Sequence, residues 1–476
     1  MTMMPLLSLP LCALTAFTWA GALLHGPGGS TGSNPWDRTA AGLPCTLLPS
    51  RQAVAEAAFG QRGEFGAAVA ITVREVRANL PGERLGERLG GRLCAVGSPQ
   101  AMEAGSPRGG VRLFSVGALG PSTGVCASAV RGTLRPGDLS AHSRFGAALA
   151  FHGTDLLAVG APGADSAAGS RAGLVRLYRV GSVGDPGPLP ILQLVELHPP
   201  GSADGAAFGH SLAFRADGLQ IAVGAPMARS TSGAAFAGRV HVFDRSGGEW
   251  SLRFSVESPQ PGVAATFGQS LAWAGEMLIV GAPGDGAIAP AAGRVFGFHG
   301  VGLDAGRLAW DLGAPAGTDG AAGLRYGESI AAIDTTTFAV GGWGRAIVEV
   351  FRLSSTGEPI HQALLTGDPT EGFGLRVAGA ADRLFVGAPF AAGDLGQVSA
   401  GRVEVFQRSS IGWQRAGALQ GSCPNAGAEF GVAIAAASEF DGTGAAGEVR
   451  VIVGEPGSSA ACLGQGGCAA GAARVD

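Results

Sequence analysis

The sequence predicts an all-β protein, specifically a seven-bladed β-propeller of four-stranded antiparallel blades. Three observations support this prediction. Glycine and proline are abundant, at 82 and 28 of 476 residues, without the Gly-X-Y period of collagen. A pair consisting of an aromatic residue and glycine recurs seven times, and an apolar run that ends in glycine follows every pair.

The aromatic-glycine pair marks the start of each repeat. Successive aromatic residues lie 47 to 80 residues apart. The pairs are Phe65-Gly66, Phe145-Gly146, Phe208-Gly209, Phe267-Gly268, Tyr326-Gly327, Phe373-Gly374 and Phe430-Gly431. The glycines that end the apolar runs, most of them followed by Ala-Pro, are Gly97, Gly160, Gly224, Gly281, Gly341, Gly387 and Gly454.

Each repeat can be divided into four short strands. In the third repeat, 211–214 is small and apolar, as expected for a strand close to an axis. The continuous apolar run 219–223 predicts a strand covered on both faces, and 239–243 alternates as a strand does. A weaker fourth strand is visible at 192–197 in the preceding repeat. Such a sheet is apolar on both faces, so the blades must cover one another around a ring.

The two ends of the chain are predicted to close this ring. The last repeat ends at Asp476 without room for a fourth strand, whereas 45–50 resembles a fourth strand with no blade of its own. We therefore expect the N-terminal strand to complete the last blade, and we assign residues 45–476 to the propeller.

The N-terminal segment predicts export. Residues 1–22 are apolar and uncharged and end in small residues, which indicates a signal peptide or, as the alternative, a signal anchor. Residues 23–44 are expected to form a flexible leader. Because no second apolar stretch follows the propeller, we expect a secreted or cell-surface protein without a transmembrane stalk.

Six cysteines remain after the signal segment. They are Cys45, Cys94, Cys126, Cys423, Cys462 and Cys468, an even number that is compatible with disulfide bonds in an exported protein. Ring closure would bring Cys45 near the C-terminal cysteines, which suggests a bridge to Cys423, Cys462 or Cys468. Free or only locally paired cysteines are the alternative.

The repeated Phe-Gly and Gly-Ala-Pro pattern resembles the FG-GAP repeat family, best known as the propeller head of integrin α subunits. The resemblance covers nearly all of the chain after the signal segment. It implies an extracellular or cell-surface module that binds other proteins through loops on one face of the ring.

Many members of that family carry a calcium loop between the aromatic-glycine pair and Gly-Ala-Pro. Here five repeats leave only 14 to 16 residues between the aromatic residue and the glycine, so tight hairpins are expected instead. The longer last repeat contains a degenerate version of the calcium loop, with Glu439, Asp441, Thr443 and Glu448 as candidate ligands. No other cofactor is expected.

The loops after Gly-Ala-Pro differ from repeat to repeat, unlike the strands. They contain the candidate ligand-face residues Asp165, Arg229, Trp343, Phe390 and Asp394.

No catalytic motif accompanies the repeats. Ser211, Ser270 and Ser329 occupy equivalent repeat positions in Gly-x-Ser, which favours a structural role. A net charge of −4 without a basic run argues against a nucleic-acid partner. We expect a monomeric, non-catalytic protein-binding or adhesion module. The alternatives are a carbohydrate-active or other secreted enzyme that uses the central funnel, and an architectural surface protein without a discrete ligand.

Overall fold

The computed structural model describes the propeller region in segments. These are 45–46, 67–72, 92–103, 105–116, 130–181, 188–201, 203–315, 322–394, 396–421, 426–440, 446–456 and 470–475, with the backbone alone described at 45–46, 92, 116, 439–440, 446–448 and 470–475. The predicted signal segment 1–22 and leader 23–44 lie outside these segments. Within them, no helix has the length and apolar character needed to cross a bilayer.

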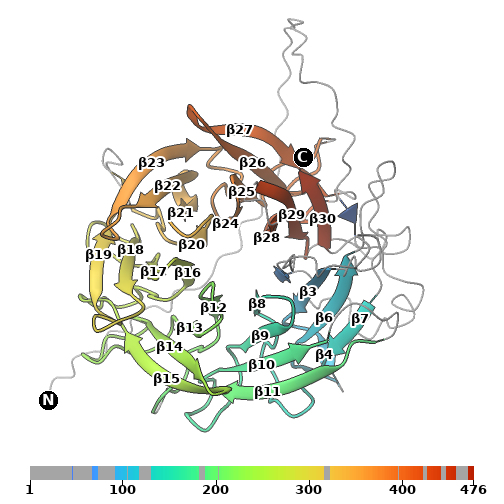
Figure 1. Ribbon diagram of the computed structural model, residues 1–476, viewed down its shortest axis with the longest axis vertical. Coiled ribbons are helices and arrows are strands. Elements are labelled where there is room, and N and C mark those ends of the chain that lie inside the picture. The colour runs from blue at the N-terminus through green and yellow to red at the C-terminus, as the bar shows by residue number, and fades with distance from the viewer. Residues whose placement is uncertain are drawn as a thin grey trace, which may run out of the picture. The chain divides into compact units, whose positions relative to one another are not determined.

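Six four-stranded antiparallel sheets each take their strands from one stretch of the chain, and we call them blades 1 to 6 in chain order (Figure 1). From the inner to the outer strand, blade 1 consists of β2 (Ala68–Ile71), β3 (Arg92–Ser98), β6 (Gly110–Val116) and β7 (Val130–Leu134), and blade 2 of β8 (Ala148–His152), β9 (Leu156–Ala161), β10 (Leu174–Val180) and β11 (Ile191–Leu197). Blade 3 consists of β12 (Ser211–Phe214), β13 (Gln220–Ala225), β14 (Arg239–Ser246) and β15 (Glu249–Val256), and blade 4 of β16 (Ser270–Ala274), β17 (Met277–Ala282), β18 (Arg294–His299) and β19 (Leu308–Leu312). Blade 5 consists of β20 (Ser329–Ala332), β21 (Thr337–Gly342), β22 (Ile347–Leu353) and β23 (Pro359–Thr366), and blade 6 of β24 (Arg376–Ala380), β25 (Arg383–Ala388), β26 (Arg402–Ser409) and β27 (Gly412–Leu419). A two-stranded ribbon, β4 (Met102–Glu103) and β5 (Ser106–Pro107), extends from blade 1.

A further four-stranded sheet combines both ends of the chain, and we call it the composite sheet. Its strands are β28 (Ala433–Phe440), β29 (Ala446–Gly454), β30 (Ala470–Val475) and β1 (Cys45–Thr46). Cys45 lies opposite Ala472 and Thr46 lies opposite Gly471 in the antiparallel register of β1 and β30. The N-terminal strand therefore joins the last repeat as its fourth strand, as expected.

The inner strands follow one another around a common axis (Figure 1). Each contacts the next in the order β2, β8, β12, β16, β20, β24 and β28, and β28 contacts β2. The prediction of an all-β propeller with four-stranded antiparallel blades is confirmed. Of the seven blades expected, six are continuous, and the composite sheet occupies the position of the last repeat.

The second strands form the buried layer of the propeller. Every residue of β9, β13, β17, β21 and β25 is buried, whereas the outer strands β15 and β27 are largely exposed. Neighbouring blades cover both faces of a second strand, which explains why its sequence is a continuous apolar run rather than an alternating one.

The junction between blades depends on the glycine that ends each second strand. A Cβ added to Gly281 would overlap the carbonyl oxygen of Gly327, the glycine of the next aromatic-glycine pair. The same overlap recurs at every junction that the structure describes. The pairs are Gly97 with Gly146, Gly160 with Gly209, Gly224 with Gly268, Gly281 with Gly327, Gly341 with Gly374, and Gly387 with Gly431. Any other residue would push adjacent blades apart.

A second glycine lets the next blade approach at the start of the third strand. Gly238 has a φ of 88° and pairs in a parallel bridge with Phe267 of the following repeat. The buried Phe267 donates its backbone N–H to Ala237 O at 2.9 Å, and Gly268 donates to Gly281 O at 2.9 Å. The Phe267-Gly268 pair therefore joins the second strand of its own blade, β17, to the second-to-third loop of the preceding blade.

The Gly-x-Ser serines have the structural role that the sequence predicted. Ser211 Oγ donates a hydrogen bond to Gly268 O at 2.7 Å, and Ser270 Oγ donates to Gly327 O at 2.7 Å. Ser329 Oγ donates to Gly374 O at 3.0 Å. Each serine thus links its inner strand to the aromatic-glycine pair of the next blade.

The glycine junction predicts a large difference between two glycine-to-alanine substitutions. Gly281→Ala should lower the free energy of unfolding by roughly 2–4 kcal/mol, because the added methyl group overlaps the carbonyl of Gly327. Gly417→Ala is the matched control, since Gly417 lies on the exposed strand β27 with no heavy atom within 4 Å of the added Cβ. Denaturant unfolding measures both, and equal effects would contradict the junction.

Candidate functional site

The candidate ligand residues all lie on one face of the propeller, which we call the loop face. Because consecutive strands are antiparallel, this face carries the loops from second to third strands and the connections between blades. Asp165, Arg229, Trp343, Phe390 and Asp394 all belong to second-to-third loops. They come from four different blades, and no hydrogen bond in the described part of the chain joins two of them.

The three polar candidates stabilise the loop face itself. Asp165 accepts hydrogen bonds from Arg171 N at 2.8 Å and Ser170 Oγ at 3.2 Å, and these bonds lower the pKa of the Asp165 carboxyl. Arg229 Nη1 donates to Gly233 O at 2.7 Å inside its own loop. Asp394 accepts from Gln420 Nε2 at 2.7 Å, across to the connection after β27.

The two aromatic candidates differ in exposure. Phe390 is 39% exposed, and its ring lies beside Gly372 on the neighbouring connection. Trp343 begins the single 3-10 helix in the described residues, Trp343–Arg345, and is half-buried. Its indole Nε1 is buried and has no hydrogen-bond partner in the described residues. Phe390 can therefore contact a partner directly, whereas Trp343 retains an unsatisfied donor.

Backbone hydrogen bonds hold the loops against the connection that precedes each blade. Gly163 N donates to Ser143 O at 3.0 Å, and Gly284 N donates to Ala265 O at 3.1 Å. Similar bonds join Met227 N to Ala206 O at 3.2 Å and Phe390 N to Glu371 O at 3.0 Å. The blades thus present the loop side chains on a fixed backbone.

Most of the apolar side chains that this face exposes were not predicted from the sequence. Among the described residues, fourteen large apolar side chains are exposed, and seven of them lie on the loop face. These seven are Met102, Met227, Phe236, Val263, Ile288, Phe390 and Val398. Only Leu219, Leu303 and Ile411 lie on the opposite face, and the remaining four lie on outer strands. A single apolar residue inside a Gly- and Ala-rich loop is the signal that could have identified them.

One loop position has the same backbone in several blades but a different side chain in each. It lies two residues before the third-strand glycine and has a left-handed φ of 49° to 53° at Arg171, Phe236, Ala291 and Ser399. The carbonyl of Phe236 accepts from Thr266 N at 3.1 Å, and equivalent bonds fix Ala291 and Ser399. Blade 3 uses this position to expose Phe236, which is 53% accessible.

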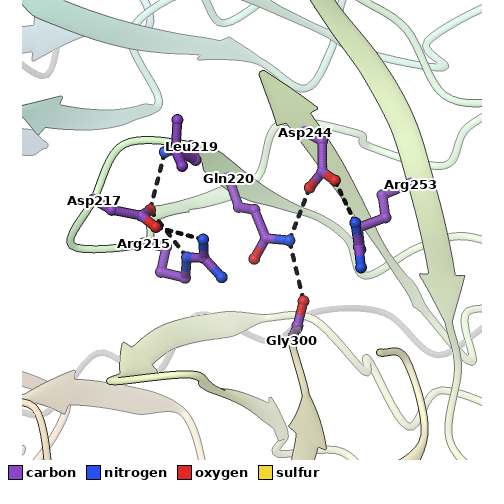
Figure 2. Close-up of polar contacts among 7 residues, drawn as sticks. All are labelled: Arg215, Asp217, Leu219, Gln220, Asp244, Arg253 and Gly300. Carbon is purple, nitrogen blue, oxygen red and sulfur yellow. Dashed lines mark hydrogen bonds and ion pairs between the residues drawn. The ribbon is translucent and has the colours of Figure 1, made fainter. Parts of the chain in front are cut away.

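Polar groups on the opposite face bond to one another around Gln220. Figure 2 shows Gln220 Nε2 donating to Asp244 Oδ1 at 2.8 Å and to Gly300 O of blade 4 at 3.0 Å. In the turn from β12 to β13, Asp217 pairs with Arg215 and accepts from Leu219 N at 3.0 Å. The first-to-second connections of blades 2 to 6 contain only a few residues each, so the expected tight hairpins are confirmed.

A second group of polar residues lies where the inner strands begin, and we call Arg144, His210, Gln269, Arg325, Glu328 and Arg376 the axial cluster. Its members come from five repeats and lie within two residues of the aromatic-glycine pairs. Arg325 Nε donates to Glu328 Oε2 at 2.8 Å, and Gln269 Nε2 donates to Glu328 Oε1 at 3.3 Å. Arg376 Nη1 donates only to Leu375 O, at 2.8 Å.

The axial cluster is electropositive. Burial, together with the charges of Arg376 and Arg144, lowers the pKa of His210 to about 4, so the imidazole is neutral at physiological pH. Burial also lowers the pKa of Arg376, although an arginine stays protonated. The cluster therefore contains three guanidinium groups and one carboxylate, Glu328, which pairs with Arg325.

The cysteine and calcium predictions have mixed outcomes. Cys94 is a free thiol, 0% exposed in the middle of β3, where burial raises the pKa to about 12. Its proposed disulfide role is therefore wrong, because core side chains such as Val96 and Phe114 surround it. The side chain of Cys45 is not described, and Cys126, Cys423, Cys462 and Cys468 lie outside the described residues.

For the calcium loop, Glu439 and Glu448 are placed by their backbone on β28 and β29, while Asp441 and Thr443 lie outside the described residues. Within the described segments, no group of three or more His, Cys, Asp or Glu side chains could hold a metal ion. Calcium binding remains a prediction.

Glu455 departs from the Gly-Ala-Pro pattern that precedes the second-to-third loops. It replaces the alanine of Gly-Ala-Pro, and the corresponding Ala225, Ala282 and Ala388 are 0% exposed. Glu455 is also 0% exposed, and neither carboxylate oxygen has a hydrogen-bond partner within the described residues. Burial raises the pKa of Glu455 to about 8.

Together these features define a β-propeller with four-stranded blades, a loop face with exposed apolar side chains and a charged axial cluster. No known family model and no curated protein match the sequence. Among solved structures, Sqt1 of Saccharomyces cerevisiae is 11% identical with a TM-score of 0.46, over 91% of this chain and 100% of that one. Sqt1 of Chaetomium thermophilum is 14% identical with a TM-score of 0.44, over 84% of each chain. At such low identity and TM-score, we infer nothing about this chain's partner from either structure.

Glu455 predicts a pH-dependent stability. The pKa of its carboxyl is about 8 in the folded state and roughly 4.3 when unfolded, so the folded state binds one more proton between these values. The free energy of unfolding should fall by about 1.4 kcal/mol for each pH unit in this range as the pH rises. Glu455→Ala, which introduces the residue of four other repeats, should be more stable at neutral pH and lose this dependence.

Denaturant unfolding at several pH values between about 5 and 8 measures this difference. Glu455→Gln is the control that keeps the size of the side chain without its charge. If both variants lose stability in parallel with the wild type, Glu455 does not titrate as described.

Proposed function

We propose that this chain is a non-catalytic, protein-binding propeller of the FG-GAP type that engages a protein partner through its loop face. The observation that carries the proposal is the concentration of exposed large apolar side chains on that face. A protein interface needs apolar and aromatic anchors that stay exposed in the free protein, within a polar surround.

The fixed backbone of the loops supports the same proposal. Phe236 and Phe390 are held by backbone hydrogen bonds rather than by packing of their own rings into the core. A preformed anchor loses little conformational freedom on binding, which favours affinity. The variable position that presents Phe236 in one blade and Arg171 or Ser399 in others would allow specificity to change without altering the fold.

The sequence also supports a proposal about where the protein acts and what it does there. The apolar segment 1–22 supports secretion or surface attachment, and the Phe-Gly and Gly-Ala-Pro pattern supports an adhesion role like that of integrin α propellers. We further propose that the composite sheet acts as a seventh blade in a monomeric ring, because β28 contacts both β24 and β2.

The alternative functions receive less support from the described residues. An enzyme that uses the central funnel would need a reactive pair at the axis. Glu328 accepts hydrogen bonds from Arg325 and Gln269 rather than from His210, and His210 is neutral. An architectural protein without a ligand would not need exposed aromatic side chains on one face.

Display of random peptides tests the loop face directly. Peptides selected for binding to the wild type should bind the double variant Phe236→Ser and Phe390→Ser at least about tenfold more weakly, because both anchors are lost. Leu303→Ser with Ile411→Ser is the matched control, since these exposed apolar residues lie on the opposite face. Equilibrium binding of the selected peptides measures the affinities.

Both double variants should unfold at the same denaturant concentration as the wild type, because all four side chains are exposed. The proposal fails if the selected peptides bind the loop-face variant normally, or if the opposite-face variant is the one that loses binding.

A further inference from the structure

We propose that the axial cluster is a binding site for an oxyanion, either a carboxylate or a phosphate group. This site is separate from the apolar anchors of the loop face, and the proposal does not depend on the identity of a protein partner. It rests on the position, the charge and the unused hydrogen-bonding capacity of Arg376 and Arg144.

Arg376 departs from the repeat in a way that the fold does not require. The equivalent position in three other blades is Ser211, Ser270 or Ser329, and each of these serines donates to the carbonyl of the next blade. Arg376 instead donates to Leu375 O, the carbonyl of its own neighbour in the chain. A structural hydrogen bond between blades is thus replaced by a positive charge at the axis.

The guanidinium groups have donors that no carboxylate occupies. Among the described residues, Glu328 is the only acid whose charge affects the pKa of Arg376. The two side chains share no hydrogen bond, and the Glu328 oxygens accept hydrogen bonds from Arg325 and Gln269 instead. Arg144 is exposed, and its guanidinium group makes no hydrogen bond or ion pair with the described residues. Arginine presents a planar set of donors that matches the oxygens of a carboxylate or phosphate.

The charge at the axis also favours an anion. The axial cluster contains three arginines, Arg144, Arg325 and Arg376, and one acid, Glu328, in a chain whose net charge is −4. The partial burial of Arg376 strengthens its attraction for a negative group, since less water screens it. His210 adds a neutral imidazole that can donate a further hydrogen bond.

Titration with inorganic phosphate, followed by calorimetry and by NMR of the histidine rings, tests the site. The wild type should bind phosphate with a dissociation constant of roughly 1–10 mM. The bound anion should raise the pKa of His210 from about 4 towards the ordinary value, because it offsets the charges of Arg376 and Arg144. A His210→Asn variant identifies the signal of this ring.

Arg376→Ser and Arg144→Ala should each weaken phosphate binding about tenfold or more. Arg376→Ser places the residue of three other repeats at this position and should fold, as unfolding curves will show. Arg253→Ala is the matched control, because Arg253 Nη1 already pairs with Asp244 Oδ2 at 2.6 Å, away from the axis. It should bind phosphate as the wild type does.

A capped glycine-rich peptide with one central glutamate, compared with its glutamine counterpart, separates a side-chain carboxylate from a free anion. Phosphate binding that depends on Arg376 supports a site for a free anion. Binding of the glutamate peptide that depends on Arg376 supports a site for a side-chain carboxylate. The proposal is overturned if neither probe binds, or if Arg376→Ser and Arg144→Ala bind as tightly as Arg253→Ala. The Phe236→Ser and Phe390→Ser variant should leave these affinities unchanged.

Discussion

The close approach of one blade to the next at a pair of glycines is the contact on which the rest of the structure depends. The carbonyl of Gly327, for example, occupies the space that a side chain at Gly281 would need, and five other junctions repeat this arrangement. Because each blade is apolar on both faces, it is stable only when its neighbours cover it. The glycines set how closely they can do so, and the serine and backbone hydrogen bonds fix the orientation.

This constraint separates positions that the fold fixes from positions that remain free to vary. The aromatic-glycine pair, the second-strand glycine and the glycine before the third strand are fixed by contact between blades. The loop residue represented by Phe236 and Arg171, and the inner-strand position occupied by Arg376, are not. The chain places the exposed Phe236 and the charged Arg376 at these free positions, and each contributes to one of the two proposals.

Much of the fold could be predicted from the sequence because each repeat carries the same pattern of apolar runs and glycines. The buried second strands, the tight hairpins and the pairing of 45–46 with the last repeat all followed from recurring patterns in the chain. The axial cluster could not be predicted in this way, since its members come from five repeats and meet only around the axis. The exposure of Phe236 also depends on tertiary context, and counting cysteines could not reveal that Cys94 is enclosed within a blade.

Native-state hydrogen exchange at the motif glycines tests the central claim most directly. The N–H groups of Gly146, Gly209, Gly268, Gly327, Gly374 and Gly431 each donate to the second-strand glycine of their own blade, at the point where the next blade docks. If blades stabilise one another through these contacts, all six amides should exchange slowly and at similar rates, through one cooperative opening. Fast exchange at these glycines, or a different rate for each blade, would contradict the account.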